Sequence, residues 1–563
     1  MSASDRLEPG GPGYGGLMRR NSGLGTGEEA GDRGQGEVVV SFQAQQRKSI
    51  ESAAAGTRAG RKFGDDLRAA SSSSSSGGGE GFLDAVQSSR FIFSMSIVIE
   101  HSLAQCLGRT GHGIQKFGFL WTQMFFIISG FVLTYASRSR GFPASVKGRV
   151  TFFLQRYFSV WYPYVFVWIC VNGLRMVMQR PERISKGWLP AIELTMLQAW
   201  FPGFPTSEEY SWRLTNGPTW FLSAISFHYC LMPAIDHLYI KCLNWLGLLA
   251  VIAAAWAFSW VPFNVCTAYH PDILAFNVMM YNPLLFLPTT AAAMALGRLY
   301  VEYQRELAKG QDAARAVQWL HAVALHAPAA TCILVGAYTT IIIDSHEATD
   351  YYQSEFMFMS RHGRWLPLEL LLMWCLACES HVDPVQWVLK RPTMVFLGGI
   401  GLNTYLLHFP MKQIVEDWQM LKNVPDKQRD RWCKSNVYRS PQFLDNVQYV
   451  PKVDVHMLTP HPNVWFIVYI TVLLAAAVAM HHFIEGPVRR LIRRMFPRET
   501  PPVPGEEERA AWWHRPVSVL GSCTYLALAL GAGGALTVWG KRWSYKSMNL
   551  SNEADLSTCS WSS

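Results

Sequence analysis

Apolar segments of about twenty residues recur along this chain, and polar loops separate them. A helix of about twenty apolar residues is long enough to cross the ~30 Å hydrocarbon core of a bilayer. The pattern therefore predicts an all-α fold, a polytopic bundle of transmembrane helices. The eleven predicted spans are 88–107, 117–137, 157–177, 219–239, 243–263, 277–301, 319–343, 364–380, 393–412, 463–484 and 517–539.

The first 85 residues have a different composition. They are rich in Gly, Ser and charged residues, include the run SSSSSSGGG, and contain no apolar segment that could build a core. Such a composition predicts disorder. We therefore divide the chain into a disordered, Gly/Ser-rich cytoplasmic tail (1–85), a transmembrane domain (86–498) and a last part (499–563). That last part holds a linker, the eleventh span and a short C-terminal tail.

Composition and charge agree with a membrane protein. Half of the 563 residues (50%) are hydrophobic and 16% are charged, against about 25% charged residues in soluble domains. The net charge is +9, and basic loops, including RRLIRRMFPR at 489–498, lie on the cytoplasmic side if the N-terminus is cytoplasmic. A basic loop at 413–462 lies on the opposite side. We expect a cytoplasmic N-terminus, and no nucleic-acid partner because no long basic run carries interleaved aromatic residues.

The first span contains two ionisable side chains, Arg90 and His101, with ten residues between them. On an α-helix this spacing is about three turns and ~16 Å, so both side chains share a face. It places the guanidinium near one membrane surface and the imidazole near the midplane. A charged group at that depth costs about 2.5 kcal/mol or more, which makes it a functional candidate. The alternatives are a snorkelling arginine and a buried, hydrogen-bonded histidine.

Four further segments carry polar or small residues in a definite order. The second span reads QMFFIISGFVLTYASRSR, and the third begins FFLQRYFSVWYPYV. The ninth reads GGIGLNTYLLHFP, and the tenth ends HHFIEGPVRRLIRR. His481, His482 and Glu485 have near-helical metal-ligand spacing, but no other cluster completes a site, so we predict no metal.

Together these segments resemble the acyltransferase-3 family of multi-pass membrane O-acyltransferases, over about residues 86–498. The family pattern includes an Arg and a His ten residues apart, an FFxxSGF element, a basic stretch before aromatic-Pro-aromatic, a Tyr-Leu-x-His-x-Pro element and a closing Glu-x-Pro. The matching residues are Arg90, His101, Phe125, Phe126, Ser129, Gly130, Phe131, Arg156, Tyr162, Pro163, Tyr164, Tyr405, Leu406, His408, Pro410, Glu485, Pro487, Arg489 and Arg490.

The resemblance implies an acyltransferase that moves an acyl group, such as acetyl, from cytoplasmic acyl-CoA to a hydroxyl of a carbohydrate, glycan or lipid. No bound cofactor is expected, since acetyl-CoA would be a substrate. Imidazole, with an ordinary pKa near 6.5, suits the base that removes the hydroxyl proton. The predicted catalytic residues are His101 and its neighbour Glu100, although Glu100 points about 100° away on a helix. The predicted substrate or acyl-CoA-binding residues are Arg90, Arg156, Ser129, Tyr405 and His408.

Two departures from the family pattern limit this interpretation. The family often has a second arginine three residues after the first in the third segment, where this chain has Ser159. It also often has a glutamate after Trp-x-Leu in the fourth span, where this chain continues to Ile225. The first change predicts weaker binding of acyl-CoA phosphates, and the second predicts altered donor or acceptor chemistry. A catalytically altered or inactive member is therefore an alternative.

Two other classes of protein fit the same helices. A proton-coupled transporter would also place His and Glu inside the membrane. However, transporters often consist of repeated halves, and the sequence shows no clear internal repeat. A non-catalytic receptor or scaffold on the acyltransferase fold would explain the two departures. Turnover of acyl-CoA distinguishes the enzyme from both.

Overall fold

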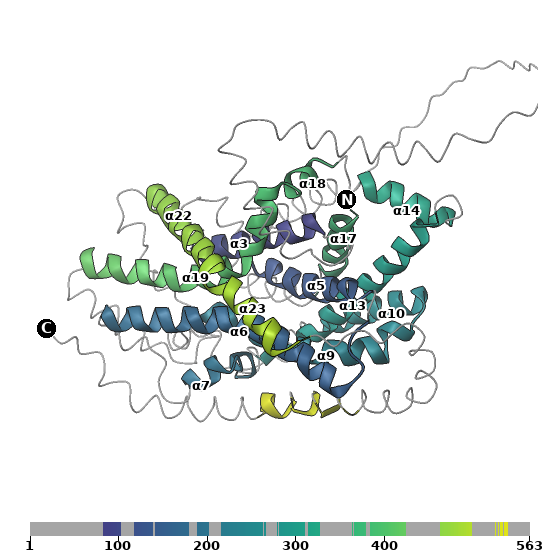
Figure 1. Ribbon diagram of the computed structural model, residues 1–563, viewed down its shortest axis with the longest axis horizontal. Helices are drawn as coiled ribbons and strands as arrows, with labels where there is room; N and C mark the ends of the chain where they lie inside the picture. Colours follow the sequence, from purple (N-terminus) through teal and green to yellow (C-terminus); the bar gives the residue numbers. More distant parts are fainter. Residues whose placement is uncertain are drawn as a thin grey trace, which may run out of the picture. The chain divides into compact units, whose positions relative to one another are not determined.

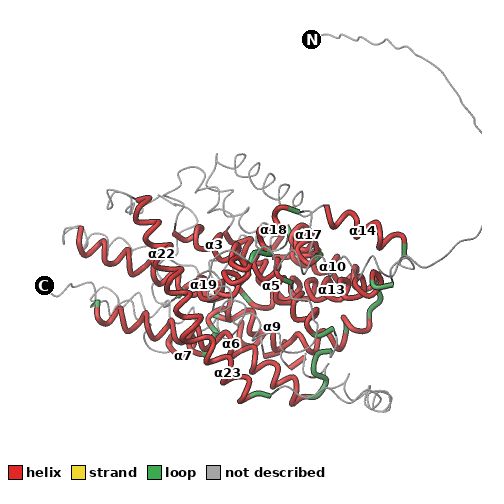
Figure 2. Tube along the Cα trace, turned by 45° about the horizontal axis from the view of Figure 1, so that its top comes forward, coloured by secondary structure: helices red, strands yellow, loops and turns green. Residues whose placement is uncertain are grey.

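The computed structural model describes thirteen stretches of the chain up to residue 497, and residues 524, 527–528, 530–532 and 534–538, all within the unit formed by residues 80–563. Every regular element among these residues is a helix, and they include no strand (Figure 2). The predicted all-α class is therefore confirmed. Residues 1–82, with nearly all of the predicted tail, lie outside the described residues. The described stretches are 83–102, 118–138, 141–178, 189–201, 216–262, 264–265, 278–279, 281–309, 314–326, 363, 365–378, 383–423 and 462–497.

The helices follow one another along the chain with short 3-10 segments between some of them (Figure 1). The first half contains α3 (Asp84–Ser102), α5 (Gly118–Ala136), α6 (Val146–Val177), α7 (Leu189–Leu194), η2 (Gln198–Trp200), η3 (Gly217–Thr219), α9 (Trp220–Leu238), η4 (Ile240–Cys242) and α10 (Trp245–Ser259). The second half contains α13 (Pro283–Leu307), α14 (Arg315–His326), α17 (Leu366–Ala377), α18 (Pro384–Leu389), α19 (Pro392–Asn423), α22 (Pro462–Met480), the π-helix η6 (His481–Glu485) and α23 (Gly486–Met495).

Several of these helices suit a bilayer. Four are long and apolar enough to cross it: Val146–Val177, Pro283–Leu307, Pro392–Ile414 and Phe466–Met495. Three shorter apolar helices are Trp121–Ala136, Trp245–Ser259 and Leu366–Ala377. Large apolar side chains are exposed on α6, α10 and α22, among them Ile169, Trp245, Leu246, Ile467 and Val472. Apolar surface of this kind is unfavourable in water and favourable against lipid chains.

The central helices pack in a row in which α19 contacts α3, α3 contacts α5, α5 contacts α13, and α13 contacts α10. Small residues make the α5–α13 contact close. A Cβ atom on Gly130 would lie 2.8 Å from the carbonyl oxygen of Thr290, and one on Gly297 would lie 2.9 Å from that of Phe131. Glycine therefore lets the two backbones approach, as expected for helices that associate within lipid.

The contact between α3 and α19 is closer still. A Cβ atom on Gly398 would lie 2.0 Å from the carbonyl oxygen of Gln87, so only glycine fits there. One turn further along α19, the carbonyl of Gly401 accepts a hydrogen bond of 2.9 Å from the Ser94 hydroxyl of α3. The GGIG segment of α19 thus forms the surface on which α3 lies.

Several helix boundaries differ from the prediction, and three of these differences bear on the site. The third helix begins at Val146 rather than residue 157, because the Ser145 hydroxyl accepts a hydrogen bond from the amide of Gly148 and caps the helix. Arg156, expected just before a span, therefore lies inside α6. The helix α19 continues to Asn423, past the predicted end at residue 412. After α22 the chain remains helical through η6 and α23 to Met495, past residue 484.

We expect Gly398→Ala to separate α3 from α19 and to destabilise the protein by about 1–3 kcal/mol, as other over-packed interiors do. The neighbouring Gly399→Ala is the matched control, because its Cβ would meet its nearest atom, Nε2 of Gln87, at an ordinary 3.8 Å. Thermal unfolding of both variants in detergent checks the prediction. Equal melting temperatures would show that the contact does not limit the approach of the helices.

Candidate active site

The two ionisable residues of the first span lie on one unbroken helix, α3. Arg90 is in its first half, and His101 is in its last turn. Because the helix has no break between them, their separation along the axis is about 16 Å, or three turns. The arginine and the imidazole therefore belong to two different groups of side chains, one at each end of the helix.

At the C-terminal end of α3, the imidazole of His101 forms a pair with that of His408 on α19. Nδ1 of His101 lies 3.0 Å from Nε2 of His408, and the ring centroids are 5.1 Å apart. The ring of Phe409 also packs edge-on against His101, with centroids 5.7 Å apart. His408 is completely buried, whereas His101 is partly buried.

The hydrogen-bond partners assign the tautomers of this pair. Nδ1 of His408 faces the backbone carbonyl of Tyr405, which can only accept, so this nitrogen carries a proton. In the neutral ring, Nε2 of His408 is then an acceptor, and Nδ1 of His101 must donate to it. The lone pair of neutral His101 is consequently on Nε2. A nitrogen in this state can act as a general base.

Hydrogen bonds to the backbone of α19 near Pro410 hold His408 in place. Pro410 lacks the amide N–H that would bond the carbonyl of Leu406, and the side-chain amide of Asn216 bonds that carbonyl instead, at 2.8 Å. The Tyr469 hydroxyl donates to the carbonyl of His408 at 2.7 Å. The Tyr405 hydroxyl donates to the carbonyl of Pro218, which connects α19 to η3, the short helix just before α9.

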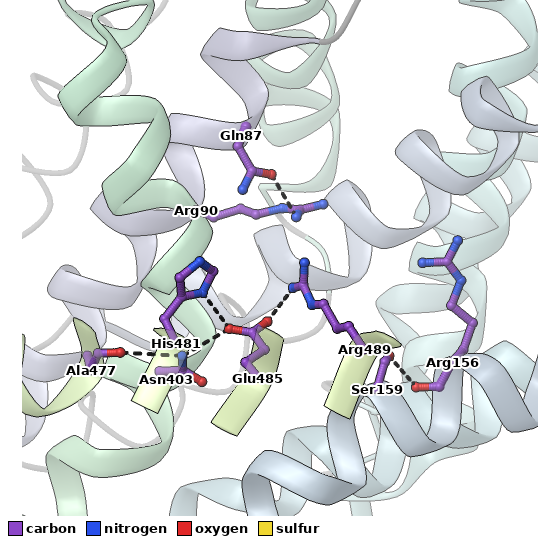
Figure 3. A network of polar contacts seen from close by, with 9 residues as sticks. All are labelled: Gln87, Arg90, Arg156, Ser159, Asn403, Ala477, His481, Glu485 and Arg489. Carbon is purple, nitrogen blue, oxygen red and sulfur yellow. Dashed lines mark hydrogen bonds and ion pairs between the residues drawn. The ribbon is translucent and has the colours of Figure 1, made fainter. Parts of the chain in front are cut away.

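Near the N-terminal end of α3, three arginines from different helices face one region (Figure 3). Nη1 of Arg90 donates to Oε1 of Gln87 at 2.9 Å. The positive charges of Arg489 on α23 and of Arg156 on α6 are close enough to repel the Arg90 guanidinium. Like charges are gathered here in spite of their mutual repulsion.

A buried carboxylate, Glu485, stabilises one of these arginines. Its Oε2 accepts a hydrogen bond of 2.7 Å from Nδ1 of His481 and one of 3.1 Å from Nδ2 of Asn403. Its Oε1 pairs with the guanidinium of Arg489 (Figure 3). Asn403 is itself buried on α19 and also reaches the carbonyl of Ala477 at 3.5 Å. The π-helical turn η6 places His481 and Glu485 side by side for these contacts.

The predicted site residues still to be placed are Arg156, Ser129 and Glu100. Arg156 belongs to the arginine group, and the Ser159 hydroxyl bonds the carbonyl of Arg156 at 2.7 Å. Ser129 is on α5 beside Gly130, and its role in substrate binding stays a prediction. The side chain of Glu100 lies outside the described residues. Ile225, at the family's glutamate position, is a buried residue of the apolar core.

Asn403 and His228 are among the buried polar residues that sequence reasoning missed. Asn403 lies within an apolar segment of α19, and only its side-chain contacts with α22 and η6 reveal its role. His228 on α9 is fully buried, where Nε2 faces the carbonyl of Pro283 at 2.8 Å and Nδ1 faces the Thr290 hydroxyl at 2.7 Å. A lone histidine in an apolar span was the available signal. Since both of its nitrogens are used within the core, His228 fits a structural role.

A helical bundle of this length and hydropathy, with paired ionisable side chains in its interior, defines an integral membrane protein with a polar site. The family model for the acyltransferase-3 acyltransferase domain matches residues 83–482. The chain therefore belongs to this family and is a membrane acyltransferase, which confirms the resemblance found in the sequence. No curated protein and no solved structure matches the chain.

Proposed function

We propose that this protein transfers an acyl group, such as acetyl, from cytoplasmic acyl-CoA to a hydroxyl of a carbohydrate, glycan or lipid. The observation that carries the proposal is the hydrogen bond between His101 and His408, which leaves the lone pair of neutral His101 on Nε2. An oriented imidazole of this kind is what an acceptor hydroxyl needs in order to lose its proton.

The arginine group supports the binding of acyl-CoA at the opposite end of α3. Guanidinium groups bind phosphates with strong, charge-assisted hydrogen bonds. The basic helix α23 lies at the same end, because the charge of Arg489 acts on Arg90. Basic residues favour the cytoplasmic side of a membrane, which agrees with a cytoplasmic N-terminus and a cytoplasmic donor. In acyl-CoA, the flexible pantetheine arm separates the phosphates from the thioester. In the protein, about three helical turns separate Arg90, the proposed phosphate ligand, from His101, the proposed base.

In the proposed reaction, Nε2 of His101 takes the proton of the acceptor hydroxyl while the hydroxyl oxygen attacks the carbonyl carbon of the thioester. A carbon–oxygen bond forms and the carbon–sulfur bond breaks. The CoA thiolate leaves and receives the proton from the imidazolium, which restores the neutral ring. His408 does not touch the reacting atoms in this scheme, and acts as a positioning residue that fixes the tautomer of His101.

We expect His101→Ala to lower the rate of acyl transfer by about 10²–10⁴-fold, the usual contribution of a general base. The measurement is incorporation of label from labelled acetyl-CoA into glycan and lipid fractions of the host cell by purified protein in vesicles. His482→Ala is the control, since His482 is exposed and outside the histidine pair. Transfer by His101→Ala at the wild-type rate would remove the base from the scheme.

Replacement of Arg90 by Gln should weaken binding of acetyl-CoA more than it slows the chemical step. Loss of one charge-assisted contact predicts about a tenfold higher KM with a smaller change in kcat. Steady-state kinetics with varied acetyl-CoA check this, with the melting temperature as the control for folding. An unchanged KM in a folded variant would contradict a role of Arg90 in donor binding.

Two substitutions at His408 separate positioning from packing. His408→Phe keeps a buried ring but removes the acceptor for Nδ1 of His101, so kcat should fall about tenfold or more while KM for acetyl-CoA stays the same. His408→Gln retains an acceptor oxygen and should recover part of kcat. If both variants fold and lose the same activity, the hydrogen bond does not explain the effect.

A further inference from the structure

The helix α19 continues beyond His408, on the side away from the arginine group, and Gln413 lies on this part of it. Asn403, which bonds Glu485 beside the arginines, precedes His408 by five residues, and Gln413 follows it by five. Each of these steps is about 7.5 Å, so the three side chains lie in this order along the helix. In the proposed reaction the donor comes from the arginine end. The acceptor must therefore reach His101 from the other direction, in which Gln413 lies.

The side-chain amide of Gln413 has a defined orientation. Nη2 of Arg175, on α6, donates a hydrogen bond to its Oε1. A guanidinium can only donate, so the amide oxygen must face Arg175 and the amide nitrogen must point away from it. Arg175 is buried, whereas Gln413 is partly exposed. A buried arginine thus holds Gln413 so that its two N–H donors are directed away from the guanidinium.

The ring of Phe409 connects this amide with the histidine pair. It packs edge-on against His101, with ring centroids 5.7 Å apart. Gln413 follows Phe409 by four residues, and residues with this spacing share a face of a helix, about 6 Å apart along its axis. The amide of Gln413 therefore lies on the face of α19 that contacts His101, one turn beyond the ring.

A buried amide oxygen lies beside the same turn of α19. Nδ2 of Asn216 donates to the carbonyl of Leu406, which points along the helix toward its next turn. A Cβ atom on the adjacent Gly217 would lie 3.8 Å from Cε1 of Phe409. Among the described residues, no donor reaches the buried Oδ1 of Asn216. This oxygen can only accept and the amide nitrogen of Gln413 can only donate, whereas a hydroxyl does both.

We propose that Gln413, oriented by Arg175, binds a second hydroxyl of the acceptor, next to the hydroxyl that loses its proton to His101. A ring with two neighbouring hydroxyls, as in a sugar, uses both groups, whereas an alcohol with one hydroxyl uses only His101. Gln413 therefore selects for a vicinal diol, and Arg175 acts as a positioning residue. This inference rests on the proposed function, because it assumes transfer of an acyl group to a hydroxyl.

The first test compares two small acceptors that differ by one hydroxyl. One is trans-1,2-cyclohexanediol, and the other is cyclohexanol, which has the same ring. Transfer of label from labelled acetyl-CoA to each alcohol is measured with purified protein in vesicles. The wild type should have a KM for the diol about fivefold to tenfold lower, the usual effect of one more hydrogen bond. Equal KM values for the two alcohols would overturn the proposal.

Replacement of Gln413 by Met tests the residue itself. Met has a similar length but no N–H donor. We expect KM for the diol to rise about fivefold to tenfold, and KM for cyclohexanol and for acetyl-CoA to stay unchanged. Gln87→Met is the matched control, because Gln87 also accepts a hydrogen bond from an arginine, near the other end of α3. It should leave the ratio of the two acceptor KM values unchanged. An equal rise for both alcohols in Gln413→Met would overturn the proposal.

Two substitutions of Arg175 test its positioning role. Arg175→Met removes the donor that holds Oε1 of Gln413, so KM for the diol should rise while KM for cyclohexanol stays the same. Arg175→Lys retains a donor and should recover part of the preference for the diol. Melting temperatures show which variants fold. A folded Arg175→Met variant with the wild-type ratio of KM values would remove Arg175 from the proposal.

Failure of this inference is distinguishable from failure of the proposed function. Wild-type protein that transfers acetyl to neither alcohol, and to neither the glycan nor the lipid fraction of the host cell, would refute the proposed function itself. Transfer to the lipid fraction and to cyclohexanol without preference for the diol would refute only the role of Gln413. Transfer to the host fractions without any transfer to the diol would also refute only this inference.

Discussion

The close packing of α3 against α19 determines where the ionisable side chains of this protein meet. Lipid chains are as apolar as the side chains of the helices, so apolar contact alone gives little reason for two helices to associate. Here a glycine at position 398 leaves room for the backbone of Gln87, and Ser94 bonds the backbone of Gly401. With the register of the two helices fixed in this way, His101 at the end of α3 reaches His408 on α19.

The same two helices contact a polar group at each end of α3, and each group has a different energetic requirement. Neutral imidazoles can be buried at modest cost when their nitrogens are hydrogen-bonded. A buried carboxylate needs several partners, and Glu485 has them in His481, Asn403 and Arg489. Removing one partner would leave a charge in an apolar environment. The arginine end is therefore the more demanding part of the bundle, and Asn403 couples it to α19.

The sequence was sufficient for the fold class and for the placement of Arg90 and His101 on one helix, because hydrophobic length and residue spacing are local properties. It was not sufficient for the pairs that connect distant segments. The contact of His101 with His408 joins residues 307 positions apart, and that of Asn403 with Glu485 joins residues 82 apart. Helix ends were also missed where a polar side chain extends a helix, as Ser145 does at the start of α6. The long-range pairs depend on tertiary packing, which periodicity does not encode, whereas the Ser145 cap is a local contact that hydrophobic length does not reveal.

The length of α3 constrains which part of a donor can interact with which residue. In the proposed reaction the phosphates stay with the arginines, and the thioester must reach His101 about three turns away. The acyl group, attached beyond the sulfur, then extends past the imidazole and away from the arginines. Among the described residues, those that contact His101 at that point include His408 and Phe409, and the Tyr405 ring packs against His408. Selectivity for the acyl chain and for the acceptor would therefore depend on this end of α19, and affinity for the donor on α23 and α6.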